Sequence, residues 1–251
     1  MNTIKVNKKN TLMVAHRGVC GLEPENSIPA FVAAGNRSYY GIETDVHVTA
    51  DGKFICFHDE QTARVAGDDI NVETSSYGLV RKIVLDNICL MEKKTGEKIG
   101  ELKGRDDLLI PRLEDYINIC KKYEKKAVLE VKNPMVPEDI ARLVEEIRAL
   151  DYLEHVIFIS FHLENLIELR RILPNQKLQY ITSKRFSDEM HHALIEYKLD
   201  WDAYHPTITK EIMDMLHAEG IKINSWTVDD VEVAERLVEW GIDYLTSDIL
   251  E

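Results

Sequence analysis

Residues 220–247, GIKINSWTVDDVEVAERLVEWGIDYLTS, have the pattern of one strand–helix–strand unit. Apolar runs at 223–228 and 243–247 flank a stretch, 231–240, whose apolar residues recur at helical spacing. Gly241 follows that stretch, where glycine favours the end of a helix. Two strands joined by a helix in this order predict a parallel pair.

The same alternation continues outward through most of the chain. Strands are predicted at 12–16, 41–48, 127–132, 156–160, 178–182, 201–205, 223–228 and 243–247. Helices are predicted between them at 27–36, 113–123, 138–150, 164–172, 188–197, 210–218 and 231–240. This count of strands suits an α/β fold that closes into a TIM (β/α)8 barrel, as a single domain over residues 1–251.

One further apolar run, at 54–58, follows the second strand after only four residues. A parallel crossover needs a dozen or more residues, so this run is predicted to be an added hairpin strand. With a turn of those four residues, Thr49 pairs with Phe54, and Asp45 lies opposite His58.

Residues 60–107 fit no strand–helix unit, because they are polar and charged with scattered glycines. They are predicted to form a small insertion over one barrel mouth. Long loops in compact domains are usually functional, so a lid and a subunit contact are two interpretations, and a tolerated excursion is the third.

The charge balance restricts the class of partner. The chain has 31 Lys and Arg against 44 Asp and Glu, a net charge of −13, which argues against nucleic acid. No run of 18 apolar residues occurs, so we expect no stable membrane association. The first residues lack the apolar stretch of a signal peptide, and the four cysteines show no CxxC pairing. Both features indicate a cytoplasmic protein with reduced thiols.

Three acidic residues are predicted to meet at one end of the sheet. Glu43 and Asp45 are two residues apart on a strand and share a face, and Glu130 lies near the end of another strand. Clustered carboxylates need a cation, and oxygen ligands without Cys or His favour one Mg²⁺ or Ca²⁺ over Zn²⁺. An ion-paired or solvated strand face is the alternative interpretation.

Basic and imidazole side chains lie at the same predicted end. Lys132 shares the face of Glu130, and Arg17 can present its fork to two phosphate oxygens, although Lys132 could also be only a structural partner of Glu130. His16 and His58 are suited to general acid and base catalysis of phosphodiester cleavage. Trp226 could wall a pocket or pack in the barrel. Further candidates near strand ends are His47, His162 and His205.

Together these residues resemble the glycerophosphodiester phosphodiesterase family, from about residue 12 to residue 248. The resemblance is carried in order by HRG (16–18), PENS (24–27), ETDV (43–46), TADG (49–52), HD (58–59), IPRLE (110–114), EVK (130–132), SF (160–161), WTVD (226–229) and GID (241–243).

The resemblance implies a TIM barrel with a small insertion and the hydrolysis of a glycerophosphodiester, such as glycerophosphocholine or glycerophosphoethanolamine, to sn-glycerol 3-phosphate and an alcohol. It implies that the three carboxylates hold the divalent cation, that the two histidines are catalytic, and that Arg17 and Lys132 hold the phosphate. Glu25 and Asn26 match positions near the site and are expected to support it. We expect His16 to act as base and His58 as acid, and attack by the substrate's own hydroxyl through a cyclic phosphate is compatible with these residues.

Two departures from the family pattern concern the alcohol. Residues 86–103 are longer and more charged than the usual insertion, and Ile249 stands where proline often follows Ser-Asp. The rival functions are a barrel phospholipase acting on intact lipid and a non-catalytic barrel that binds phosphorylated metabolites. A homo-oligomer is compatible with the sequence.

Overall fold

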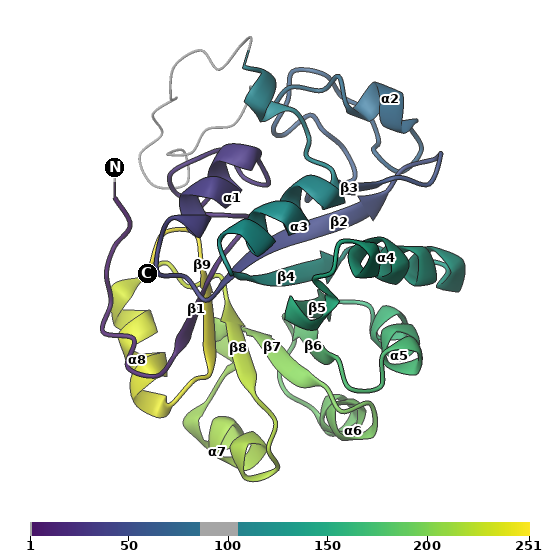
Figure 1. Ribbon diagram of the computed structural model, residues 1–251. Coiled ribbons are helices and arrows are strands. Elements are labelled where there is room, and N and C mark those ends of the chain that lie inside the picture. The colour runs from purple at the N-terminus through teal and green to yellow at the C-terminus, as the bar shows by residue number, and fades with distance from the viewer. Residues whose placement is uncertain (1, 86–104) are drawn as a thin grey trace.

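The computed structural model describes residues 2–85 and 105–251, and within them eight parallel strands close into a barrel (Figure 1). β1 pairs with both β2 and β9, so the ring has no free edge. The predicted barrel is therefore confirmed. The ring strands are β1 (Leu12–Ala15), β2 (Gly41–Val48), β4 (Lys126–Val131), β5 (Val156–Ser160), β6 (Lys177–Thr182), β7 (Asp200–Tyr204), β8 (Ile223–Trp226) and β9 (Tyr244–Ser247).

The predicted helices connect the ring strands and lie around the outside of the barrel (Figure 1). Ser27 caps the first of them by accepting from the Ala30 N–H, and the last ends at Gly241, whose φ of 96° is left-handed. They are α1 (Ile28–Gly35), α3 (Leu113–Lys122), α4 (Pro137–Ala149), α5 (Leu163–Ile172), α6 (Asp188–Glu196), α7 (Lys210–Ala218) and α8 (Val231–Trp240). Short 3₁₀ turns are η1 (Asp106–Leu108), η2 (Leu153–His155) and η3 (His205–Thr207).

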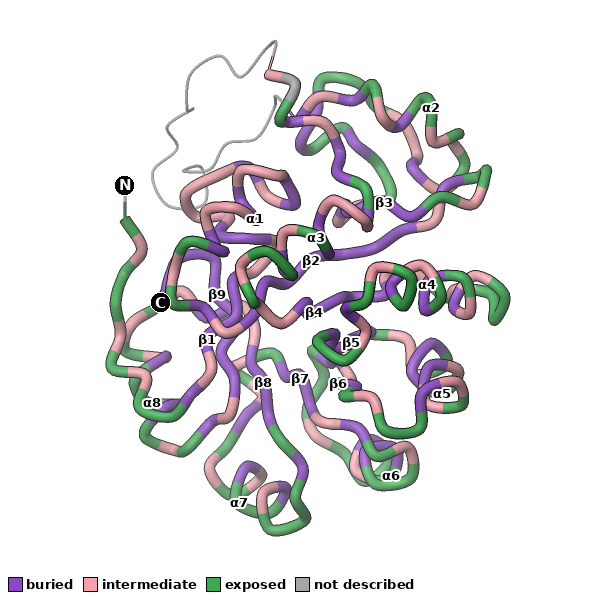
Figure 2. The backbone as a smooth tube through the Cα atoms, viewed as in Figure 1, coloured by how far each residue is buried: buried purple, intermediate pink, exposed green. Residues whose placement is uncertain are grey.

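Alternation along each strand divides the core into two layers. Inward side chains such as Ile157 and Ile159 pack together inside the barrel, whereas Phe158 between them packs outward in the layer beneath the helices. Figure 2 shows buried residues along the strands and exposed residues on the outer faces of the helices. The mouth of the barrel is therefore set on a rigid, tightly packed wall.

β3 (Phe54–Cys56) pairs antiparallel with β2 and lies outside the ring, as predicted for the hairpin. The predicted register is wrong by one residue. Val48, not Thr49, pairs with Phe54, and Asp45 does not lie opposite His58.

The Thr49 side chain accounts for this shift. Its Oγ1 accepts from the Lys53 N–H at 3.0 Å, and its own N–H donates to the Lys53 carbonyl at 2.9 Å. Gly52 supplies the left-handed residue at φ 75°. Thr49 therefore belongs to the turn, and Phe57 donates its N–H to the Asp45 carbonyl at 3.0 Å. His58 follows this last pair.

The described part of the insertion has an apolar cluster that its polar composition did not indicate. A short helix, α2 (Tyr77–Val80), belongs to it. Where the chain enters and leaves the insertion, the Cys56 N–H donates to the Pro111 carbonyl at 2.9 Å. The cluster comprises Ile55, Phe57, Val65, Ala66, Val72, Val80, Ile83, Leu85, Leu108 and Ile110.

Residues 86–103, where the sequence departs from the family pattern, lie outside the described residues, and so does Cys89. Cys20, Cys56 and Cys120 carry free thiols. Among the helices of the described ranges, none combines the length and the apolar character needed to cross a bilayer.

Candidate active site

The three predicted carboxylates meet where Glu43 and Asp45, within β2, lie beside the carboxyl end of β4. Asp45 and Glu130 are neighbours across the parallel pair, and oxygens of Glu43, Asp45 and Glu130 lie within 4.8 Å of one another. All three side chains are buried. Burial and repulsion from Asp45 and Glu130 raise the pKa of Glu43 well above its usual range. Burial and Asp45 also raise the pKa of Glu130, to about 7.

Cations balance only part of this charge. Lys132 Nζ lies 2.9 Å from Glu130 Oε1 and 3.3 Å from Asp45 Oδ1, and Arg17 Nε lies 3.7 Å from Asp45 Oδ2. Burial raises the pKa of Asp45, but Lys132, His58 and Arg17 outweigh it and hold that pKa well below its usual range. The donor set is oxygen only, and a further cation would relieve the repulsion that raises two of the three pKa values. These residues therefore fit a divalent metal ion of the hard class.

Asn26 supports the cluster from the loop before α1. Its Nδ2 donates to Asp45 Oδ2 at 2.8 Å, and its Oδ1 accepts from the Thr44 hydroxyl at 2.6 Å. Asn26 has a φ of 50°, a conformation that asparagine tolerates better than most residues. The contacts place Asn26 beside the carboxylate cluster, and its supporting role there stays a prediction.

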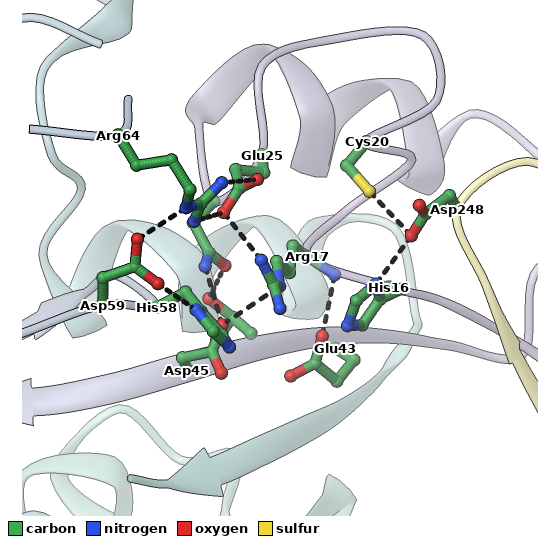
Figure 3. A network of polar contacts seen from close by, with 12 residues as sticks. His16, Arg17, Cys20, Glu25, Glu43, Asp45, His58, Asp59, Arg64 and Asp248 are labelled. Carbon is green, nitrogen blue, oxygen red and sulfur yellow. Dashed lines mark hydrogen bonds and ion pairs between the residues drawn. The ribbon is translucent and has the colours of Figure 1, made fainter. Parts of the chain in front are cut away.

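Each predicted catalytic histidine is held by a carboxylate. His16 Nδ1 lies 2.6 Å from Asp248 Oδ1, and His58 Nδ1 lies 2.5 Å from Asp59 Oδ1 (Figure 3). A carboxylate at Nδ1 fixes the ring and leaves Nε2 for the cavity that both rings line. Burial lowers the pKa of His58 despite the hydrogen bond to Asp59.

Neither Asp248 nor Asp59 was predicted from the sequence to hold a histidine. Asp59 could have been found, because it follows His58 directly. Asp248 lies 232 residues from His16 and gave no local signal. Its Oδ1 also accepts from the Cys20 thiol at 3.0 Å.

A chain of ion pairs joins the site to the insertion (Figure 3). Arg64 donates to both oxygens of Glu25, at 2.7 and 2.8 Å, and through Nε to Asp59 at 2.6 Å. Glu25 also accepts from Arg17 Nη1 at 2.8 Å, while the Arg17 backbone N–H donates to Glu43 at 2.7 Å. Burial raises the pKa of Glu25, but Arg64 and Arg17 outweigh it and lower that pKa to about 2. Glu25 thus lies between Arg17 and Arg64, and its supporting role stays a prediction. The contact with Arg64 was not predicted from the sequence.

Two cavities open beside His58. The first, the throat, is a space of about 60 Å³ inside the mouth, and its residues are His16, Arg17, Glu43, His58, Glu130, Ile159, Phe161, Ile181, Asp202, Trp226 and Thr246. The second, the groove, has about 470 Å³ between the insertion and the end of β4, and its residues are His47, His58, Asp59, Glu60, Gln61, Arg64, Lys132 and Asn133.

Trp226 forms one wall of the throat. Its Nε1 donates to the Asp202 carbonyl at 3.3 Å, and its ring packs edge-on against Phe161 with centroids 5.4 Å apart. Among the further histidines, His47 lines the groove and pairs with Glu73 at 2.8 Å. His162 precedes α5 and His205 begins η3, and neither lines the throat or the groove as described.

A closed parallel barrel with polar side chains gathered at the carboxyl ends of its strands has the arrangement of a TIM-barrel enzyme. Residues 16–251 match the sequence profile of the Glycerophosphoryl diester phosphodiesterase family, and the chain belongs to this family. The enzyme class expected from the sequence, glycerophosphodiester phosphodiesterase, is confirmed.

Relatives cover nearly the whole chain. A glycerophosphodiester phosphodiesterase of Caldanaerobacter subterraneus is 28% identical over 240 residues, covering 95% of this chain and 94% of its own. One of Bacillus altitudinis is 27% identical over 250 residues, covering 95% and 94%.

Solved structures share the fold. The crystal structure of a glycerophosphodiester phosphodiesterase from Parabacteroides distasonis has a TM-score of 0.75 at 26% identity, covering 95% of this chain and 93% of its own. An Oleispira antarctica phosphodiesterase, in complex with the product sn-glycerol-3-phosphate, has a TM-score of 0.81 at 21% identity, covering 98% and 96%.

Proposed function

We propose that this chain hydrolyses glycerophosphodiesters, such as glycerophosphocholine or glycerophosphoethanolamine, to sn-glycerol 3-phosphate and an alcohol, with a divalent cation and two histidines. The observation that carries this proposal is the buried cluster of Glu43, Asp45 and Glu130 beside two carboxylate-held histidines. The product bound by the Oleispira antarctica phosphodiesterase, which shares the fold, agrees with it.

Glu43, Asp45 and Glu130 would hold the cation, Mg²⁺ or Ca²⁺. When bound, such an ion neutralises phosphate oxygens and lowers the pKa of a hydroxyl or water. Arg17 and Lys132 contact the same carboxylates and would bind the remaining phosphate oxygens.

His16 and His58 would exchange the protons of the reaction through Nε2. A base must take the proton of the attacking hydroxyl, and an acid must protonate the departing alkoxide. Asp248 and Asp59 keep the two rings turned toward the throat. In this proposal His16 is the general base and His58 is the general acid.

The two cavities suggest how the diester lies. His58 lines both, so the phosphate would lie beside it, with the glycerol in the throat against Trp226 and the alcohol in the larger groove. Glu25 and Asn26 support this arrangement through Arg17 and Asp45 respectively.

The test is an assay of glycerol 3-phosphate release from glycerophosphocholine, with Glu43→Gln as the variant that lacks one proposed ligand. We expect release that stops on full chelation and returns with Mg²⁺ or Ca²⁺. Undiminished release after metal removal would refute the proposed dependence of the reaction on a divalent cation. Comparable cleavage of an intact phospholipid would favour the phospholipase, and binding without turnover would favour the non-catalytic barrel.

Four statements remain predictions from the sequence. They are the single domain over residues 1–251, a cytoplasmic location, the lack of stable membrane association, and compatibility with a homo-oligomer.

A further inference from the structure

Asp202 is a buried carboxyl group that the proposed reaction does not use. It lies on β7 with its side chain pointing into the barrel, it lines the throat, and only 2% of its surface is exposed. Its Oδ1 is buried and accepts no hydrogen bond from the described residues. In the described part of the chain it forms no ion pair with Lys or Arg.

This position costs the fold stability. Burying a polar oxygen without a hydrogen-bond partner is unfavourable, and burying an unpaired charge is more so. Burial, with Glu130 nearby, raises the pKa of Asp202 well above its usual range, although the Asn224 side chain opposes this. The neutral acid that results can both donate and accept one hydrogen bond.

On the side of β6 and β5 the neighbours of Asp202 are apolar. On the adjacent strand, Ile181 is its register partner, and Ile159 lines the same cavity on the strand beyond. Both are buried and apolar. On the other side Asn224, the register partner on β8, offers a side-chain hydrogen bond to the carboxyl group. Because Oδ1 still has no partner among the described residues, a ligand is the better explanation for that oxygen.

The shape of the throat defines that ligand. A cavity of about 60 Å³ holds about four water molecules, which suits a short carbon skeleton rather than a whole head group. Ile159, Ile181 and Trp226 offer apolar walls, and Asp202 offers one polar contact among them. A small alcohol with carbon against the walls and a hydroxyl at the carboxyl group satisfies both.

We propose that Asp202 is a specificity-determining residue that hydrogen-bonds the terminal hydroxyl of the substrate's glycerol moiety. This inference rests on the proposed function, because it assigns the throat to glycerol. A site that provides a hydrogen-bonding group for a hydroxyl rejects analogues without it, since the buried group is then left unpaired. The expected preference is about 5- to 150-fold in kcat/KM.

The experiment compares glycerophosphocholine with an analogue in which the terminal hydroxyl is replaced by hydrogen and the middle hydroxyl is kept. Choline release reports both reactions with one assay. The variants are Asp202→Leu, which removes the contact, and Asp202→Asn, which keeps a donor and an acceptor. Asp200→Asn is the matched control, because Asp200 lies on the same strand and accepts from the Lys222 N–H at 2.9 Å, away from the throat.

We expect the unsubstituted protein and Asp200→Asn to prefer the glycerol substrate, Asp202→Leu to show no preference, and Asp202→Asn to keep part of it. We also expect Asp202→Leu to melt at the same or a higher temperature, because a buried carboxyl oxygen without a partner is removed.

Two results would overturn the inference. One is a full preference in Asp202→Leu, and the other is an equal loss on both substrates with a lower melting temperature, which indicates a structural role. If Asp202→Leu does not fold, an Asp202→Asn preference equal to that of the Asp200→Asn control, with unchanged kcat and KM, also overturns it. Failure of the unsubstituted protein to release choline from either substrate would instead refute the proposed function.

Discussion

Replacing Asp248 with asparagine is expected to lower kcat by about 10- to 150-fold and to change KM little. Asp248 Oδ1 lies 2.6 Å from His16 Nδ1, and the two side chains are only 12% and 13% exposed. A hydrogen bond to a charged group contributes about 1.5–3 kcal/mol, and each 1.36 kcal/mol is tenfold in rate. The loss should fall on kcat because Asp248 would stabilise the imidazolium proposed to form on His16 and would not touch the substrate.

The assay is the initial rate of glycerol 3-phosphate release at saturating metal and substrate. Asp248→Ala serves as a second variant, because asparagine can still accept one hydrogen bond from the ring. The matched control is Asp243→Asn. Asp243 accepts from His217 Nε2 at 2.8 Å and from the Ile223 N–H at 2.9 Å, at the opposite end of the barrel. A kcat unchanged in both Asp248 variants, or lowered equally in the control, would refute the reasoning.

Three further predictions concern the metal ligands, the stability of the fold at acid pH and the roles of the two histidines in proton transfer. Glu43→Gln should abolish the rise in melting temperature caused by Mg²⁺ or Ca²⁺ without lowering that of the metal-free protein; calorimetry that finds the same rise would contradict the ligand role. Because the folded pKa of Glu25 is about 2, its stabilising effect is present above its ordinary pKa of 4.5 and is lost as pH falls toward 2. Between pH 4.5 and 2 the free energy of unfolding should therefore fall less in Glu25→Gln than in the unsubstituted protein, by at most about 3 kcal/mol. Urea titrations that find the same fall in both proteins would contradict this prediction. His58→Ala should lose little activity on a substrate with a nitrophenol leaving group, which needs no acid, whereas His16→Ala should lose activity on every substrate; the reverse pattern would exchange their roles.

Side-chain periodicity accounts for what the sequence predicted well. Glu43 and Asp45 share a face because they are two apart on a strand, and Lys132 shares the face of Glu130 for the same reason. Strongly alternating strands and helices fixed the order of the barrel. In a barrel with this order β2 pairs with β4, and this pairing places Asp45 beside Glu130.

The predictions failed where one side-chain hydrogen bond decided the local structure, or where residues far apart in the chain come into contact. The Thr49 hydroxyl lengthened the hairpin turn, an effect that counting residues does not detect. Asp248 and Arg64 reach the site from the end of the chain and from the insertion, and no periodicity links them to His16 or Glu25. Asp202 did leave a signal, because polar residues alternate with Trp201 and Ala203 along β7 and so point into the barrel.

The hydrogen bond between Cys56 and Pro111 has a consequence for how such enzymes diversify. It brings the two ends of the insertion side by side on the barrel wall, so the chain between them closes on itself. Lengthening a loop whose ends are already joined costs little entropy, about 0.6 kcal/mol for each doubling. The part of the insertion that follows Arg64 could therefore be exchanged between relatives, with His58 and Asp59 left in place. Such grafts would change the groove proposed to take the alcohol without refolding the barrel that carries the carboxylates.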